Sequence, residues 1–143
     1  MNKKGFTLIE LLVVIAIIGL LSTLAVVALG NAREKARDSK RLSDVKQMQT
    51  ALELYFNDES SYPIASAMDN CLSSDGFTAT CPTTGTVYMG QVPQDPTKEA
   101  YYTYNAVTTS YQIYVQLEGN SGGFDAGWIV ATPNGLSSTG SPE

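Results

Sequence analysis

The feature that most constrains this chain is a run of 22 residues without a charged side chain, from Leu11 to Ala32. At 1.5 Å per residue, a helix of that length covers about 33 Å, which matches a hydrocarbon core about 30 Å thick. The run therefore predicts a transmembrane helix. A cleaved secretory signal peptide is the alternative, but its apolar region usually has about 7–15 residues and ends in an A-x-A-like site, which is absent here.

One acidic residue, Glu10, stands at the start of this run, next to Leu11. A carboxylate near hydrocarbon is costly, so by default it marks a function and needs a partner or a proton. The alternative is an interfacial side chain that reaches toward lipid headgroups.

The charges divide the chain into a basic beginning and an acidic remainder. Residues 1–46 hold eight of the nine basic residues and four acids, whereas residues 47–143 hold Lys98 and ten acids, for −5 overall. No histidine is present, which excludes Ser-His-Asp triads, Cys-His pairs and His-ligated zinc. No glycine-rich phosphate loop occurs, and the acidic bulk disfavours nucleic-acid binding. We therefore predict that the chain is not an enzyme and that nucleic acid is not a partner.

A helical period continues beyond the apolar run. No proline interrupts residues 6–57, so one helix of about 52 residues would reach about 78 Å. Its second half places apolar residues three or four positions apart and should pack on a globular head. These residues are Leu42, Val45, Met48, Leu52 and Phe56.

Basic residues gather between Arg33 and Arg41. Contact with anionic lipid or DNA is one interpretation. Because acids such as Asp38 alternate with these residues, the prediction is a solvated helix face with short-range ion pairs.

Cys71 and Cys81 lie beyond the predicted anchor. An even cysteine count there predicts a disulfide outside the cytoplasm, with two free thiols or metal ligands as the alternatives. A metal site is disfavoured because no histidine or third cysteine could complete the usual four ligands.

The second half of the head shows a period of two. Residues 102–106 and 111–117 alternate in polarity around Thr108-Thr109-Ser110, which predicts an antiparallel hairpin, and residues 127–131 predict a third strand. Five tyrosines fall within residues 101–114, which suits half-buried strands; an aromatic ligand surface is the alternative. The small polar tail, residues 136–143, is predicted to be flexible.

The sequence from Lys3 to Glu10, KKGFTLIE, followed by the apolar run, resembles the amino terminus of type IV pilins and type II secretion pseudopilins. The pattern AL-x-x-Y at residues 51–55, the later Tyr62-Pro63 and the turn VPQDP at residues 92–96 resemble the major pseudopilins.

The resemblance implies a set of functional residues. A prepilin peptidase would cut between Gly5 and Phe6 and methylate the new amino terminus of Phe6. Glu10 would meet the terminal ammonium of a neighbouring subunit and set its axial register. Gly19 would let the helix loosen in the fibre, although Val27 stands where relatives often have a proline.

The resemblance also implies an α+β pilin fold, in which a long amino-terminal helix packs on a small antiparallel sheet. The expected segments are a leader (1–5), a transmembrane and polymerisation half-helix (6–32), an amphipathic half-helix (33–60), a globular head (61–135) and the tail.

The implied function is that of a structural subunit of a type IV pilus-like filament. The alternatives are the major pseudopilin of a type II secretion system and a membrane-anchored binding domain that never polymerises. The implied partners are copies of itself, the peptidase, the assembly platform with its ATPase, and membrane lipid.

The implied location is the inner membrane with the head outside the cytoplasm, then a periplasmic or cell-surface filament. The positive-inside rule opposes this orientation because six basic residues follow the apolar run and two precede it. We adopt the family orientation because the leader motif is specific.

No cofactor is predicted. The loop from Glu118 to Asp125 contains oxygen side chains among glycines, and major pseudopilins can hold calcium in a carboxy-terminal loop. Because the EF-hand spacing and the family's acidic pattern are absent, the prediction is a hairpin loop without metal, and calcium binding is the alternative.

Overall fold

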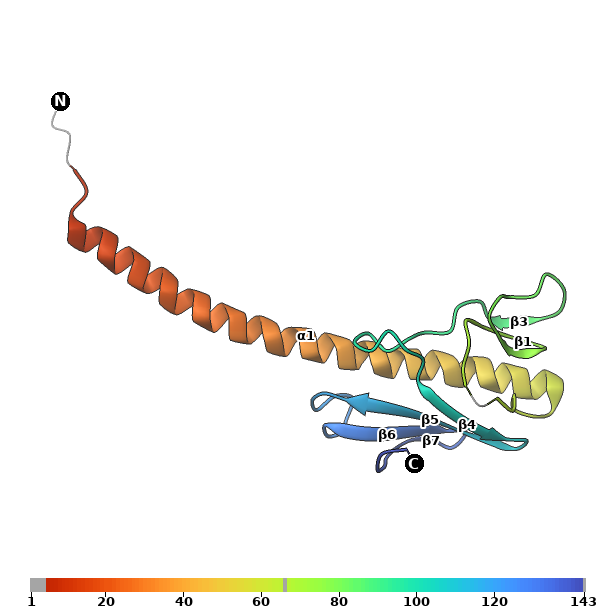
Figure 1. Ribbon diagram of the computed structural model, residues 1–143. Coiled ribbons are helices and arrows are strands. Elements are labelled where there is room, and N and C mark those ends of the chain that lie inside the picture. Colours follow the sequence, from red (N-terminus) through yellow and green to blue (C-terminus); the bar gives the residue numbers. More distant parts are fainter. Residues whose placement is uncertain (1–4, 66, 143) are drawn as a thin grey trace. The chain divides into compact units, whose positions relative to one another are not determined.

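The computed structural model describes residues 5–65 and 67–142 (Figure 1). The chain divides into two compact units, Met1–Glu34 and Lys35–Glu143. A single helix, α1 (Leu8–Glu59), contributes to both, which confirms the predicted long helix. The predicted leader lies outside the described residues except for Gly5.

The first unit contains the apolar part of α1. Its large apolar side chains are exposed on every face of the helix, from 46% for Val14 to 82% for Leu8. By length and composition, α1 contains a stretch able to cross a membrane. A helix that is apolar all round needs lipid or other helices around it.

The second unit contains the rest of α1 and two antiparallel sheets (Figure 1). The smaller sheet has the order β2-β1-β3 and the larger the order β4-β5-β6-β7. The strands are β1 (Cys71–Ser73), β2 (Gly76–Thr78), β3 (Val87–Met89), β4 (Thr103–Val107), β5 (Ser110–Leu117), β6 (Gly127–Thr132) and β7 (Gly135–Ser138).

The core of this unit joins the helix to both sheets. Val45 and Leu52 of α1 and Ile113 of β5 are fully buried in the same cluster as Leu72 of β1. The aromatic residues follow the same arrangement, because Tyr55 of α1 packs edge-on against Tyr88 of β3, and Phe77 of β2 against Tyr104 of β4. The predicted helix stripe is thus confirmed as the face that packs on the head.

The predicted hairpin and third strand are confirmed. Thr103–Val107 pairs with Ser110–Leu117, and β5 pairs in turn with β6. The buried tyrosines of this hairpin, Tyr104 and Tyr111, point to the core, as expected for half-buried strands.

The prediction of a flexible tail is wrong for residues 136–138, which belong to β7 and pair with β6. Gly135, with a φ of 122°, follows Pro133-Asn134 and lets the chain reverse. The three strands of the smaller sheet were not predicted, because three-residue strands are too short to show a period.

A disulfide joins Cys71 to Cys81, which confirms the predicted pairing. Cys71 is buried in β1, whereas Cys81 is exposed after β2. The bond therefore fixes an exposed segment to a core strand.

Candidate functional site

The start of α1 is closed by a capping box. The Thr7 backbone amide and hydroxyl donate to the Glu10 carboxylate at 2.8 and 2.7 Å, and the Glu10 amide donates to the Thr7 hydroxyl at 3.3 Å. This reciprocal pattern satisfies amides that the helix itself leaves unpaired. In the monomer, Glu10 therefore has a local partner, Thr7. The T-x-x-E spacing could have predicted this pair, but it was not among the predictions from the sequence.

The peptide bond between Gly5 and Phe6 precedes the helix. Both residues lie outside regular structure and are exposed, with 83% of Phe6 accessible. A Cβ added at Gly5 would meet nothing within 4 Å. The bond is thus accessible to a peptidase in this conformation.

The helix is continuous through Gly19, and no neighbour approaches a Cβ built there. On the next turn, the Ser22 hydroxyl donates to the Ile18 carbonyl at 2.7 Å and the Thr23 hydroxyl to the Leu20 carbonyl at 2.8 Å. Such bonds satisfy polar groups in an apolar setting and can bend a helix slightly.

A second constellation lies in the other unit, around a buried arginine. The Arg41 side chain is 2% exposed, and three segments of the chain supply its acceptors. We call this set the Arg41 cluster; it consists of Asp38, Arg41, Asp95, Thr97 and Glu118.

Every N–H of the Arg41 guanidinium has an acceptor. Nε donates to Asp95 at 2.8 Å, and Nη1 donates to Asp38 at 2.7 Å and to Glu118 at 2.6 Å. Nη2 donates to Asp95 at 3.2 Å and to the Thr97 hydroxyl at 2.8 Å. Because a guanidinium has five N–H donors, its hydrogen-bonding capacity is filled.

The carboxylates of the cluster also hold loop backbone. Asp38 accepts the amides of Glu118 and Gly119 at 3.0 and 2.8 Å. Asp95 accepts the amides of Thr97 and Lys98 at 2.8 and 3.2 Å. The cluster therefore ties the VPQDP turn and the loop after β5 to one stretch of helix.

The pKa values in the cluster follow from these bonds. Hydrogen bonds from Arg37 and Arg41 lower the pKa of Glu118 to about 2, against the opposing effect of burial. Burial alone would raise the pKa of Asp95, but the bonds from Arg41 and Thr97 outweigh it and lower the pKa well below its ordinary value. These carboxylates are charged at neutral pH and balance the two arginines.

The prediction of a solvated basic face is therefore wrong for Arg41 and Asp38, which are buried. Their predicted helical spacing is confirmed as an ion pair. Asp95 and Glu118 pair with the buried guanidinium and so offset the cost of burying its charge. They are 54 and 77 residues away in sequence, so local spacing gave no signal of them.

Another buried carboxylate, Asp44, lies about one turn beyond Arg41 on the helix. The Tyr102 hydroxyl donates to Asp44 at 3.0 Å, and both residues are buried. Burial raises the pKa of Asp44, and the bond from Tyr102 opposes that rise.

Comparison with known proteins covers both units. The Prokaryotic N-terminal methylation motif matches residues 1–26, and the model for Type II secretion system (T2SS), protein G matches residues 28–130, more than half of the chain. The chain belongs to the protein G family. The resemblance to pilins and pseudopilins, and the α+β pilin fold, are thereby confirmed.

Curated members and relatives of the protein G family cover most of the chain. A Type II secretion system core protein G from Klebsiella pneumoniae is 36% identical over 66% of this chain and 69% of its own length. The core protein G from Aeromonas hydrophila is 35% identical over 70% and 71%. The Type IV wide pilus major component PilA4 from Thermus thermophilus is 33% identical over 93% and 84%. No solved structure matches the chain significantly.

In this member of the protein G family, the acid that begins the loop from Glu118 to Asp125 is already paired. Within residues 5–65 and 67–142, no three acidic or cysteine side chains form a cluster that could hold a metal ion. Glu118 instead pairs with Arg37 and Arg41.

Proposed function

We propose that this chain is a structural subunit of a type IV pilus-like filament, waits in the membrane and polymerises through the apolar part of α1. The observation that carries the proposal is an exposed, all-round apolar helix that follows the matched methylation motif. Lipid can cover this helix before assembly and sister helices afterwards. Its role is structural, and we assign it no enzymatic activity.

The proposed maturation begins with a cut between Gly5 and Phe6 and methylation of Phe6 by a prepilin peptidase. Removal of the leader exposes a terminal ammonium one residue before Thr7. The Glu10 carboxylate then gives up its hydrogen bonds with Thr7 and forms an ion pair with the terminal ammonium of a neighbouring copy. This ion pair fixes the axial register between the two copies. Gly19 is the proposed point of loosening, because glycine lowers helix propensity by about 1 kcal/mol.

The proposed orientation places the head outside the cytoplasm. Six basic residues after the apolar run argue against it, but Arg37 and Arg41 are engaged by carboxylates of their own unit. A disulfide in the head also suits an oxidising compartment. An assembly platform with an ATPase would supply the work of extraction from the membrane. Protease protection of the head in intact spheroplasts, and its loss on lysis, would contradict this orientation.

The second candidate is a major pseudopilin of a type II secretion system, favoured by the protein G match. The pilus assignment is favoured by the pilus component that aligns with 93% of this chain. Electron microscopy of sheared surface filaments with an antibody to this protein separates the two. Labelled filaments support the pilus, and surface filaments without label contradict it.

Glu10 tests the polymerisation step. Glu10→Gln keeps the side chain's size and removes its charge, so membrane insertion should persist while filament yield falls. Thr7→Val is the matched control, because it removes the hydroxyl of the capping box and leaves the carboxylate. Normal filament yield from Glu10→Gln would contradict the proposed register role.

We also propose that the head takes no calcium, because arginines already occupy Glu118, the acid that begins the loop. Titration of the chain in detergent should release no heat with calcium and leave the melting temperature unchanged. A calcium-dependent rise in that temperature would overturn this point.

A further inference from the structure

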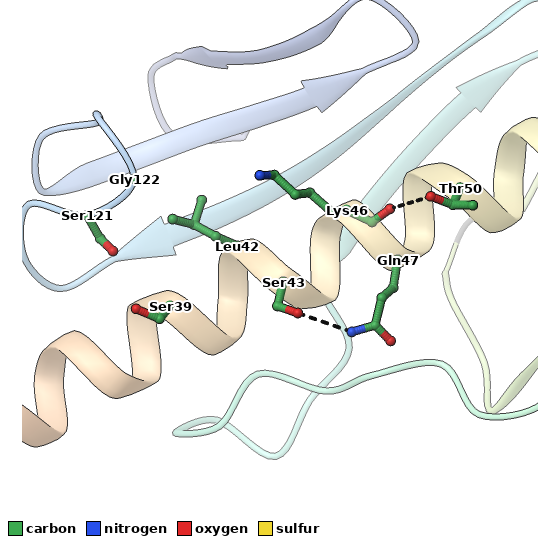
Figure 2. Close-up of a pocket in the computed structure, with 8 residues that line it drawn as sticks. All are labelled: Ser39, Leu42, Ser43, Lys46, Gln47, Thr50, Ser121 and Gly122. Carbon is green, nitrogen blue, oxygen red and sulfur yellow. Dashed lines mark hydrogen bonds between the residues drawn. The ribbon is translucent and has the colours of Figure 1, made fainter.

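A groove in the second unit carries an exposed lysine and a row of hydroxyl and amide groups. It has a volume of about 490 Å³ and lies between one stretch of α1 and the loop after β5 (Figure 2). We call it the Lys46 groove; it is lined by Ser39, Leu42, Ser43, Lys46, Gln47, Thr50, Ser121 and Gly122.

The lining of the groove is mostly polar, and its one charged side chain is that of Lys46. None of its lining residues is acidic, and within the described residues no carboxylate lies within 4 Å of the Lys46 ammonium. Glu53, further along α1, accepts the Tyr62 hydroxyl instead. The loop comes close to the helix at Gly122, which has a φ of 61° and whose nearest neighbour is the Leu42 side chain.

The complementary charge lies at the carboxyl end of the same helix. Asp58 and Glu59 are exposed in the last turn of α1, which contains no basic residue. Carboxylates are unfavourable there because the unpaired carbonyls of a helix end carry partial negative charge. A cation supplied from outside would relieve this repulsion.

Two tyrosines in contact with each other lie beside these carboxylates. The Tyr88 hydroxyl donates to the Asp58 carboxylate at 3.0 Å, so this tyrosine lies beside the end of α1. The rings of Tyr55 and Tyr88 are in contact, with centroids 5.4 Å apart. We call the two exposed carboxylates beside this tyrosine pair, Asp58 and Glu59, the acidic corner.

The two surfaces cannot meet within one subunit. Lys46 and Glu59 are 13 positions apart on a continuous helix, which is about 20 Å along its axis. Two copies displaced by about that distance would bring them together. Such a head-to-tail contact uses different surfaces on each copy and generates an open helical assembly.

We propose that the Lys46 groove receives the acidic corner of a second copy, with Lys46 paired to Glu59 or Asp58. This proposal rests on the proposed polymerisation and adds the head contact that sets the offset between copies. The hydroxyls of Ser39 and Ser121 can donate further bonds to the incoming carboxylates. The same helix thus contributes both halves of the contact.

Zero-length carbodiimide coupling of filaments tests the contact directly, because it joins an amine and a carboxylate only when they touch. Filaments assembled from a mixture of isotopically light and heavy full-length chains should give mixed-label peptides that join Lys46 to Glu59 or Asp58. Filaments that cross-link at other sites and lack these peptides would overturn the proposal.

Charge reversal supplies the functional test. Lys46→Glu should reduce filament yield about tenfold or more, because like charges then face each other. Glu59→Lys should do the same, yet the head should melt at an equal or higher temperature because a cation suits a helix carboxyl end. Combining the two substitutions should restore most of the yield.

Lys98→Glu is the matched control, because it changes the net charge equally at a lysine that lies over Trp128, outside the groove. Its yield should stay near that of the wild type. Normal filament yield from Lys46→Glu would overturn this inference. Failure of the double variant to recover would overturn it as well, because Lys46 would then bind another anion, such as a lipid phosphate. Absence of wild-type filaments would instead contradict the proposed function.

Discussion

The two units of this chain solve the same problem, a charge in an apolar setting, in opposite ways. In the first, apolar side chains stay exposed, and the acid at the start of the apolar run, Glu10, accepts hydrogen bonds from Thr7, three residues away. In the second, Arg41 is buried, and two of its three carboxylate partners, Asp95 and Glu118, lie 54 and 77 residues away in sequence. The first unit therefore depends on lipid or other copies, whereas the second carries its own stabilising contacts.

The largest expected effect breaks the second unit at its centre. Arg41→Met should destabilise the head by about 3–5 kcal/mol, because Asp38 and Asp95 remain buried without their cation. Thermal or denaturant unfolding measures this loss. Lys40→Met, at the exposed neighbouring position, is the matched control and should change stability by less than about 0.5 kcal/mol. Equal stability of both variants would contradict a structural role for the cluster.

The next effect comes from the disulfide between Cys71 and Cys81. Replacing both cysteines by serine should cost about 3 kcal/mol in the chain-entropy model. Unfolding of the oxidised and reduced wild type gives the same difference without a substitution. Because the disulfide belongs to the second unit alone, insertion of the first unit into the membrane should be the same in the reduced protein and in the serine variant. Reduction without loss of stability would show that the strands hold this segment alone.

A smaller effect concerns the buried pair of Asp44 and Tyr102. Tyr102→Phe keeps the ring and removes the donor, which should cost about 1–3 kcal/mol because the carboxylate is left without that bond. Tyr114→Phe removes a hydroxyl of β5 whose bond to Gln112 lies at the exposed surface, and it serves as the control. A similar cost for the two variants would remove the case for a specific buried bond.

The smallest effect is the dependence of head stability on pH. The pKa of Glu118 is lowered from 4.5 to about 2, so the unfolded chain binds this proton first as pH falls. Its contribution is present above pH 4.5 and is lost between about pH 4.5 and 2. Glu118→Gln should flatten that part of the curve and lower stability at pH 7. An unchanged slope would mean that other carboxyls carry the acid sensitivity.

The structural elements that could be predicted from the sequence are those that show a periodic pattern. The long helix, its apolar face and the hairpin around Thr108 follow from repeats of about 3.6 and 2 residues, which are local properties. The disulfide followed from cysteine count and expected compartment. The family motif at residues 3–10 pointed to the function.

The features that could not be predicted from the sequence depend on contacts between residues far apart in the chain. The burial of Arg41 requires Asp95 and Glu118, whose approach only the folded head creates. The strands β1–β3 are three residues each, and β7 was mistaken for a polar tail because pairing with β6, not composition, makes it a strand. The capping box of Thr7 and Glu10, in contrast, is local, and its T-x-x-E spacing was sufficient to predict it.

In the proposed filament, the chain is cut after Gly5 and keeps its whole apolar segment. Mass spectrometry of the protein from purified filaments tests this most directly. The predicted result is a chain that begins at Phe6, carries one methyl group on its amino terminus and keeps the whole apolar segment. A chain that begins at Met1, or one cut near Ala32 as a secretory signal would be, would contradict it.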